Sequence, residues 1–137
     1  MTDEVSYDKM YSFNKSITKK EGGDLTITSD IIRGHTETII LYHLMERDTY
    51  GYDINKSIIE KTDGLYELKE ATLYSAFRRL EQAEMITSYW GDENTGARRR
   101  YYTITEKGRR EYMQSVEDWQ GSKKLIDKLI GGDIYGK

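Results

Sequence analysis

The chain has 137 residues, of which 36% are hydrophobic and 33% charged, and this length fits one folded domain better than two. It contains no cysteine, which excludes a disulfide scaffold. With only two histidines, it has few residues that could ligate zinc or haem iron. The longest mainly apolar stretch, residues 38–45, is far shorter than the roughly 20 residues that span a bilayer. Asp3 and Glu4 stand where a signal peptide would be basic. Together with the lack of cysteine, these features lead us to expect a cytoplasmic protein with no metal, no cofactor and no membrane partner.

Charge is unevenly distributed along the chain. The net charge is -3, but residues 69–110 hold nine basic and six acidic residues and therefore carry +3. The rest of the chain then carries -6. This segregation predicts a local positive face on an otherwise acidic protein, and such a face attracts phosphate.

The N-terminal third predicts an arm followed by a helix. Residues 1–28 are polar, mixed in charge and lack a sustained apolar period, so we expect a mobile arm. A short helix packed on the body is the less favoured alternative for this arm. Residues 31–45 carry apolar side chains at the spacing of an amphipathic helix.

Two further helices are expected in the middle of the chain. The first is short, is capped by Asp48 or Thr49 and is ended by Asp63-Gly64. The second runs over residues 69–84. Its buried stripe consists of four apolar residues, Leu73, Ala76, Phe77 and Leu80.

A hairpin and a long helix complete the predicted elements. Two β-rich runs, 85–90 and 98–104, flank a cluster of Gly, Asn and Asp residues and indicate a hairpin. Thr105 offers the N-cap of a long helix that Gly131-Gly132 ends. Gly121 lies inside this helix and is a candidate position for a bend.

The order of the elements is that of a winged helix. The expected fold class is mainly α with a small β-hairpin wing: a winged helix-turn-helix followed by a long C-terminal dimerisation helix. We divide the chain into the polar arm (1–28), a DNA-binding domain (29–104), the dimerisation helix (105–132) and a tail (133–137).

The third helix and the hairpin carry the candidate DNA contacts. Because this helix buries one stripe, its opposite side can face the major groove. Arg98 and Arg100 share one face of the second strand and Arg99 lies on the other, where side chains of a wing can contact phosphate. The predicted contacts are Lys69, Thr72, Tyr74, Ser75, Arg78, Arg79, Arg98, Arg99 and Arg100. The alternatives are a solvated helix face and a charged strand end that deters edge pairing.

Several segments resemble the PadR family of transcriptional regulators. They are GHTETIILYHL at 34–44 with YGYDI at 50–54, ATLYSAFRRLE at 71–81 and RRYYTITEKG at 99–108, and the resemblance extends over residues 31–130. Ala71 stands where the family usually has Gly, and Ser75, which brings a hydroxyl, stands where it usually has Pro.

The resemblance implies a homodimeric repressor of the short branch, whose subunits pair mainly through the C-terminal helix. It also implies a small planar aromatic effector beside Trp119, with packing between subunits as the alternative role of this side chain. The residues expected at the dimer and effector site are Tyr112, Val116, Trp119, Ile126 and Ile130.

The sequence offers no catalytic pattern. His35 and His43 lie near no nucleophile or acidic pair, and no phosphate-binding loop or serine elbow motif is present, so we expect no enzymatic activity. The expected function is a sequence-specific, ligand-responsive regulator that binds a double-stranded DNA operator as a homodimer. The alternative is a protein-interaction module without DNA binding, which the twelve tyrosines favour because Tyr is enriched at interfaces.

Overall fold

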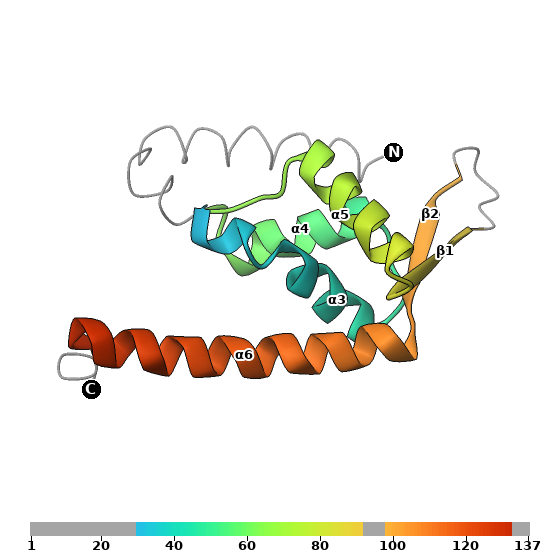
Figure 1. The fold of residues 1–137 in the computed structure, drawn as a ribbon. Coiled ribbons are helices and arrows are strands. Elements are labelled where there is room, and N and C mark those ends of the chain that lie inside the picture. Colours follow the sequence, from blue (N-terminus) through green and yellow to red (C-terminus); the bar gives the residue numbers. More distant parts are fainter. Residues whose placement is uncertain (1–29, 92–97, 133–137) are drawn as a thin grey trace.

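The computed structural model describes residues 30–91 and 98–132. The predicted arm at 1–28, most of the hairpin turn and the tail at 133–137 lie outside the described residues. The predicted fold class, mainly α with a small β-hairpin wing, is confirmed (Figure 1). The elements are α3 (Thr36–Glu46), α4 (Gly51–Lys61), α5 (Glu70–Gln82), β1 (Ile86–Trp90), β2 (Arg100–Ile104) and α6 (Glu106–Ile130).

One hydrophobic core joins the three short helices to the hairpin. Ile40 of α3, Ile54 of α4 and Phe77 of α5 are buried in it, and the Phe77 ring stacks on that of Tyr102 with centroids 3.9 Å apart. The predicted buried stripe of α5 is confirmed in full: Leu73, Ala76, Phe77 and Leu80. Burial of this stripe fixes which side of α5 faces outward.

The first predicted helix is shorter than its apolar period. One helical turn occupies residues 30–33, a turn follows at 34–35, and α3 begins at Thr36. The Thr36 hydroxyl donates to the Arg33 carbonyl at 2.8 Å, which satisfies an acceptor at the end of the first turn. Arg33 is thereby held beside α5 rather than inside a continuous helix.

The predicted cap of α4 is wrong. Its N-cap is Tyr50, in extended backbone conformation and without a side-chain capping bond. Thr49 instead pairs with the hairpin, because its carbonyl accepts from the Tyr102 N–H at 2.8 Å. Asp48 accepts from the Tyr89 hydroxyl at 2.7 Å. The loop before α4 is therefore attached to the wing.

A buried amide fixes the entry to α5. The Asn55 side chain donates to the Leu68 carbonyl at 2.8 Å and accepts from the Leu68 N–H at 2.9 Å. Leu68 immediately precedes Lys69, the N-cap of α5. The two hydrogen bonds consequently set where α5 begins relative to α4.

The wing and α6 follow the sequence expectations closely. The strands pair antiparallel with Tyr89 opposite Tyr101. The Thr105 hydroxyl accepts from the Gly108 N–H at 3.1 Å, which confirms the predicted cap, and Gly131, at φ 74°, ends the helix. The helix runs without interruption through Gly121.

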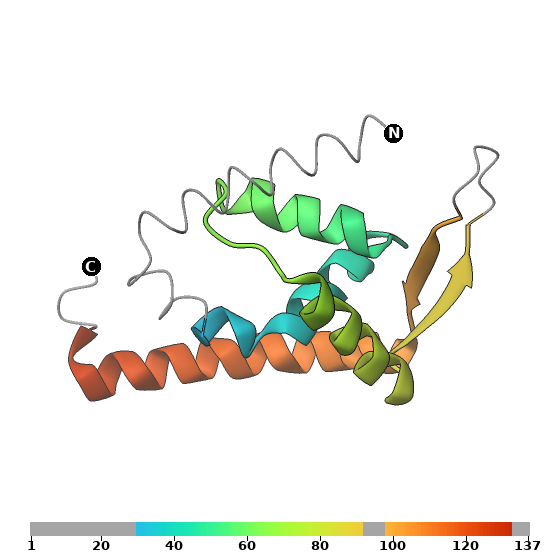
Figure 2. The same cartoon turned by 90° about the horizontal axis from the view of Figure 1, so that it is seen from above.

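Helix α3 contacts α5, α6 and β2. It packs against α5 on one side and α6 on the other. Figures 1 and 2 show that the C-terminal end of α6 extends past the other described elements. Within the described ranges, no helix combines the length and hydropathy needed to cross a bilayer.

Candidate nucleic-acid interface

The outward side of α5 is polar and lies opposite its buried stripe. Arg78 is exposed and forms no ion pair with the residues that the structure describes, and Ser75 is partly exposed. Ala71 and Gln82 are also exposed on this helix, although sequence reasoning omitted both. The helical period that predicted the buried stripe would have found them, since they stand half a turn away from it.

Tyr74 lies between the outward side and the core. Its ring contacts that of Phe77, with centroids 5.7 Å apart, and remains 44% exposed. The close approach of α4 depends on Gly51, because a Cβ there would lie 3.1 Å from the Tyr74 hydroxyl oxygen. Tyr74 thus packs at the α4–α5 contact while one side of its ring faces solvent.

One flank of α5 faces the turn before α3. A hollow of about 360 Å³ lies there, and its lining brings together three of the predicted contact residues, Thr72, Ser75 and Arg79. The Arg79 Nε donates to the Glu37 carboxylate at 2.7 Å, and its Nη1 donates to the Ser75 hydroxyl at 3.1 Å. Sequence reasoning missed Arg33, which also lines the hollow.

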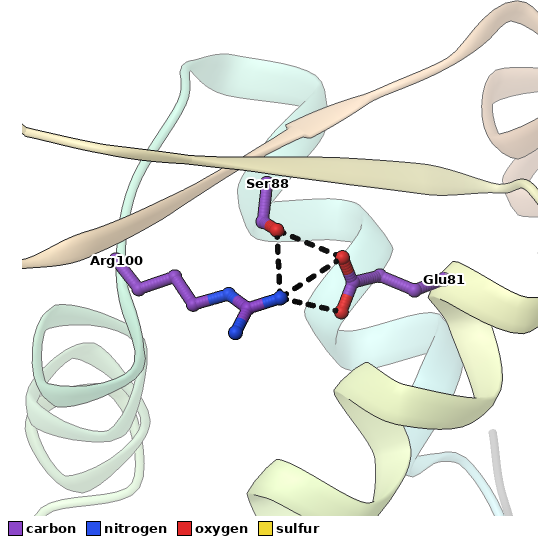
Figure 3. A network of polar contacts seen from close by, with 3 residues as sticks. All are labelled: Glu81, Ser88 and Arg100. Atoms are coloured by element: carbon purple, nitrogen blue, oxygen red, sulfur yellow. Dashed lines mark hydrogen bonds and ion pairs between the residues drawn. The ribbon is translucent and has the colours of Figure 1, made fainter.

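The opposite flank of α5 is tied to the wing by a polar network (Figure 3). Arg100 Nη2 donates to the Ser88 hydroxyl at 2.9 Å and to both oxygens of Glu81 at 3.3 Å. Ser88 in turn donates to Glu81 at 2.8 Å. These bonds join α5, β1 and β2. An exposed ion pair adds at most about 1 kcal/mol of stability, so the main effect is to fix the orientation of the wing against α5.

The other two wing arginines lie over aromatic rings. Arg98 has its Cζ 5.4 Å from the Trp90 ring centroid, and Arg99 has its Cζ 4.9 Å from that of Tyr50. Trp90 pairs with Arg100 in the hairpin register, whereas Arg98 and Arg99 precede the first residue of β2. The second strand therefore begins two residues later than predicted, and the alternation expected for the three arginines stays a prediction.

Lys69 stands at the N-terminal end of α5. It is exposed, and it lines a second hollow of about 230 Å³ together with Arg33 and Thr72. Glu67 also lines this second hollow, so the Lys69 cation stands beside an acidic residue there.

Four tyrosines around this surface have a raised pKa. Burial raises the pKa of Tyr66, Tyr74 and Tyr102 above the usual value of 10.0. The hydrogen bond to Asp48 is the main cause that raises the pKa of Tyr89. A raised pKa favours the uncharged phenol, so these four side chains add no negative charge beside the arginine and lysine cations. Among the described residues no cluster of His, Asp or Glu is suited to hold a metal ion.

The predicted dimer and effector residues of α6 fall into two groups. Tyr112 and Val116 are partly buried against the body, and Trp119 lies beside them at 38% exposure. The His35 ring meets that of Trp119 edge-on at 4.9 Å, where α3, α6 and the preceding turn enclose a hollow of about 250 Å³. Ile126 and Ile130 are exposed, and so are Leu125 and Leu129 on the same half of the helix.

Comparison with known proteins identifies relatives of the chain. The sequence pattern of the transcriptional regulator PadR-like family matches residues 40–114. An uncharacterized protein of Lysinibacillus sphaericus, protein X, is 43% identical over 106 residues, which cover 77% of this chain and 97% of that protein.

Solved structures show the same relationship. A transcriptional regulator from Clostridium thermocellum is 54% identical, with a TM-score of 0.68 and coverage of 73% of this chain and 94% of that one. A PadR family transcription regulator from Clostridium difficile is 32% identical, with a TM-score of 0.63 and coverage of 70% and 98%.

Proposed function

The chain belongs to the PadR-like family of transcriptional regulators, and we propose that it is a repressor that binds its operator as a homodimer. Membership makes it a DNA-binding regulator and not an enzyme, as the sequence predicted. It also favours DNA regulation over the alternative of an interaction module. The proposal includes a cytoplasmic location, because the operator of a bacterial regulator lies there.

The observation that carries the proposal is the set of cations around the outward side of α5. Arg78 stands on that side without an ion pair to any described residue, and Lys69 stands at its start. In this arrangement Arg78 and Ser75 approach base edges, whereas the wing arginines contact the backbone. Base contacts give sequence preference, and phosphate contacts give most of the affinity.

The exposed half of α6 supports pairing with a second copy. Its uncovered apolar side chains are Leu125, Ile126, Leu129 and Ile130. Apolar side chains gathered on one helix usually mark an interface, and a two-fold axis lets the same surface serve both subunits. Such pairing holds two copies of α5 for two half-sites that lie about 34–36 Å apart on DNA.

The hollow beside Trp119 supports a planar aromatic effector. At about 250 Å³ it is smaller than the roughly 300–1,000 Å³ of small-molecule sites. A second subunit would enlarge and close it. An effector bound between the subunits would change the separation of the two α5 helices and so weaken both half-site contacts together.

A gel shift with the DNA fragment upstream of its own gene tests the DNA proposal. We expect retention at 50 mM salt and a loss of roughly 10³–10⁵ in affinity at 200 mM if the protein makes 6–10 phosphate contacts. Arg78→Ala should weaken binding, whereas Arg110→Ala, on exposed α6, should not. Absence of retention by the native chain at low salt would contradict repression through DNA binding.

The effector proposal has a separate test in the native dimer without DNA. Proflavine, a planar aromatic dye, should quench tryptophan fluorescence in the native chain and in Trp90→Phe, but not in Trp119→Phe. Equal quenching in Trp119→Phe and the native chain would contradict an effector site beside Trp119.

A further inference from the structure

We propose that the hollow between Arg33 and Arg79 binds a backbone phosphate of DNA on the flank of α5 that faces away from the wing. This inference rests on the proposed function, and it adds Arg33, from outside the helix-turn-helix, to the DNA-binding surface. Figures 1 and 2 both place α5 between the wing and the turn that precedes α3.

The chemistry of the hollow suits a phosphate group. Arg33 and Arg79 line it, and so do the hydroxyl-bearing Thr72 and Ser75. Arg guanidinium recognises phosphate through paired N–H donors, and hydroxyl groups supply further donors. None of the described residues that line this hollow carries a carboxylate. Its lining is therefore rich in hydrogen-bond donors, and the carboxylates that pair with its two arginines, Asp30 and Glu37, lie outside it.

Arg79 is already oriented in the structure without DNA. Glu37 holds its Nε and Ser75 holds its Nη1, so two of its three nitrogens have fixed partners. Side chains that are fixed before binding lose less conformational entropy when the ligand arrives. Glu37 reaches Arg79 from α3 and therefore acts as a positioning residue for it.

Arg33 is anchored through its backbone and accessible through its side chain. Its carbonyl accepts from the Thr36 hydroxyl, which fixes the end of the helical turn. Its side chain is 60% exposed and pairs at 2.9 Å only with Asp30, also exposed, among the described residues. Such exposed pairs contribute about 0–1 kcal/mol, so a DNA phosphate can compete for the guanidinium.

The geometry of the major groove explains why this flank needs a phosphate contact. The groove is about 12 Å wide, and a helix with its side chains is about 10–12 Å across. A helix seated in the groove therefore has one sugar-phosphate strand along each flank. The wing arginines lie beyond one flank of α5, and the hollow supplies cations on the other. Ala71 and Ser75 line the hollow and also belong to the outward side, so the two surfaces are continuous.

The test measures binding of the full chain to a random-sequence duplex at several NaCl concentrations. Phosphate contacts are independent of sequence, and each contributes about -0.9 to the slope of log affinity against log salt. Arg33→Ala should make the slope less steep by about 0.9 per bound subunit. Its affinity loss relative to the native chain should then shrink about 3.5-fold per bound subunit between 50 and 200 mM salt.

Matched variants separate this contact from a general loss of charge. Arg110→Ala removes one exposed cation from α6 and should leave the slope unchanged. Arg33→Lys keeps the positive charge and should therefore retain most of the native slope. A shared phosphate also predicts that Arg33→Ala and Arg79→Ala together cost less than the sum of the two single losses. Purely additive losses would overturn the shared hollow.

The outcomes distinguish this inference from the proposed function. If the native chain binds the duplex but Arg33→Ala leaves the slope unchanged, the phosphate site is wrong and DNA binding stands. If the native chain fails to bind even at 50 mM salt, the proposed function fails, and the site falls with it. The control is the melting temperature of Arg33→Ala. If it equals that of the native chain, a reduced slope reflects a lost contact and not a lost fold.

Discussion

Replacing Asn55 by Ala should destabilise the domain at the point where α4 holds the start of α5. Asn55 and Leu68 are each 1% exposed. The side-chain amide of Asn55 bonds to both the N–H and the C=O of Leu68. Alanine removes both partners at a site that is buried from solvent in the native chain. The Leu68 N–H and C=O would then be buried without hydrogen bonds.

The size of the effect follows from the two lost hydrogen bonds. Each buried polar group left unsatisfied costs about 1–3 kcal/mol, so Asn55→Ala should lower the free energy of unfolding by about 2–6 kcal/mol. Domains of this kind are stable by about 5–15 kcal/mol, so the loss is a large share of the total. The start of α5 should also become the least protected part of the domain in hydrogen exchange.

Urea unfolding followed by circular dichroism measures this loss. The protein concentration must be the same for all variants, because the stability of a dimer depends on it. Glu60→Ala, which changes an exposed residue of the same helix, is the matched control and should stay within about 0.5 kcal/mol of the native chain. If Asn55→Ala unfolds at the same urea concentration as the control, Asn55 does not hold the entry to α5.

Three further predictions address the dimer, the core and the response to pH. Leu129 is 75% exposed, so Leu129→Asp should convert the dimer to monomers in sedimentation velocity, and an unchanged dimer would contradict pairing through α6. A Cβ at Gly108 would collide with the Met85 carbonyl oxygen, so Gly108→Ala should cost about 3 kcal/mol, and an unaltered melting temperature would refute this contact. Burial raises the pKa of Tyr102, so the folded state keeps this proton to higher pH than the unfolded chain; stability should hold below pH 10 and fall as the pH rises through the raised value. This decline, measured by urea unfolding, should be shallower in Tyr102→Phe, and an equal decline would count against burial as the cause.

Local patterns in the sequence predict the parts of the fold that depend on local interactions. The period of α5 predicts its buried stripe because a helix that packs on one side must repeat apolar residues at 3.6-residue intervals. Thr105 predicts its own capping bond because the partner, Gly108, is three residues away. Gly131 ends α6 in the left-handed conformation that glycine adopts at little cost.

Contacts between distant segments account for what the sequence could not predict. Thr49 has the chemistry of a helix cap, but the hairpin recruits its backbone, and only the folded chain brings Tyr102 to it. Arg79 and Glu37 are 42 residues apart, so their ion pair cannot be read from spacing. Arg33 was missed for the same reason, since a period gives the faces of one helix but not which neighbouring turn lies beside it.

The division of the α6 stripe has a similar cause. Tyr112 and Ile130 belong to one apolar period, but only the first half of the helix has α3 to pack against. The second half extends past the body, which leaves Ile130 exposed in a single chain. A period identifies an apolar face without stating whether the same chain or a second copy covers it.

A hydroxyl-radical footprint of the native protein on its operator tests the central claim most directly. Two copies of α5 held by paired α6 helices should protect two stretches of backbone, related by two-fold symmetry and centred about 10–10.5 base pairs apart or a multiple of this distance. A single unpaired stretch, or protection that does not repeat with the helical turn, would contradict the account.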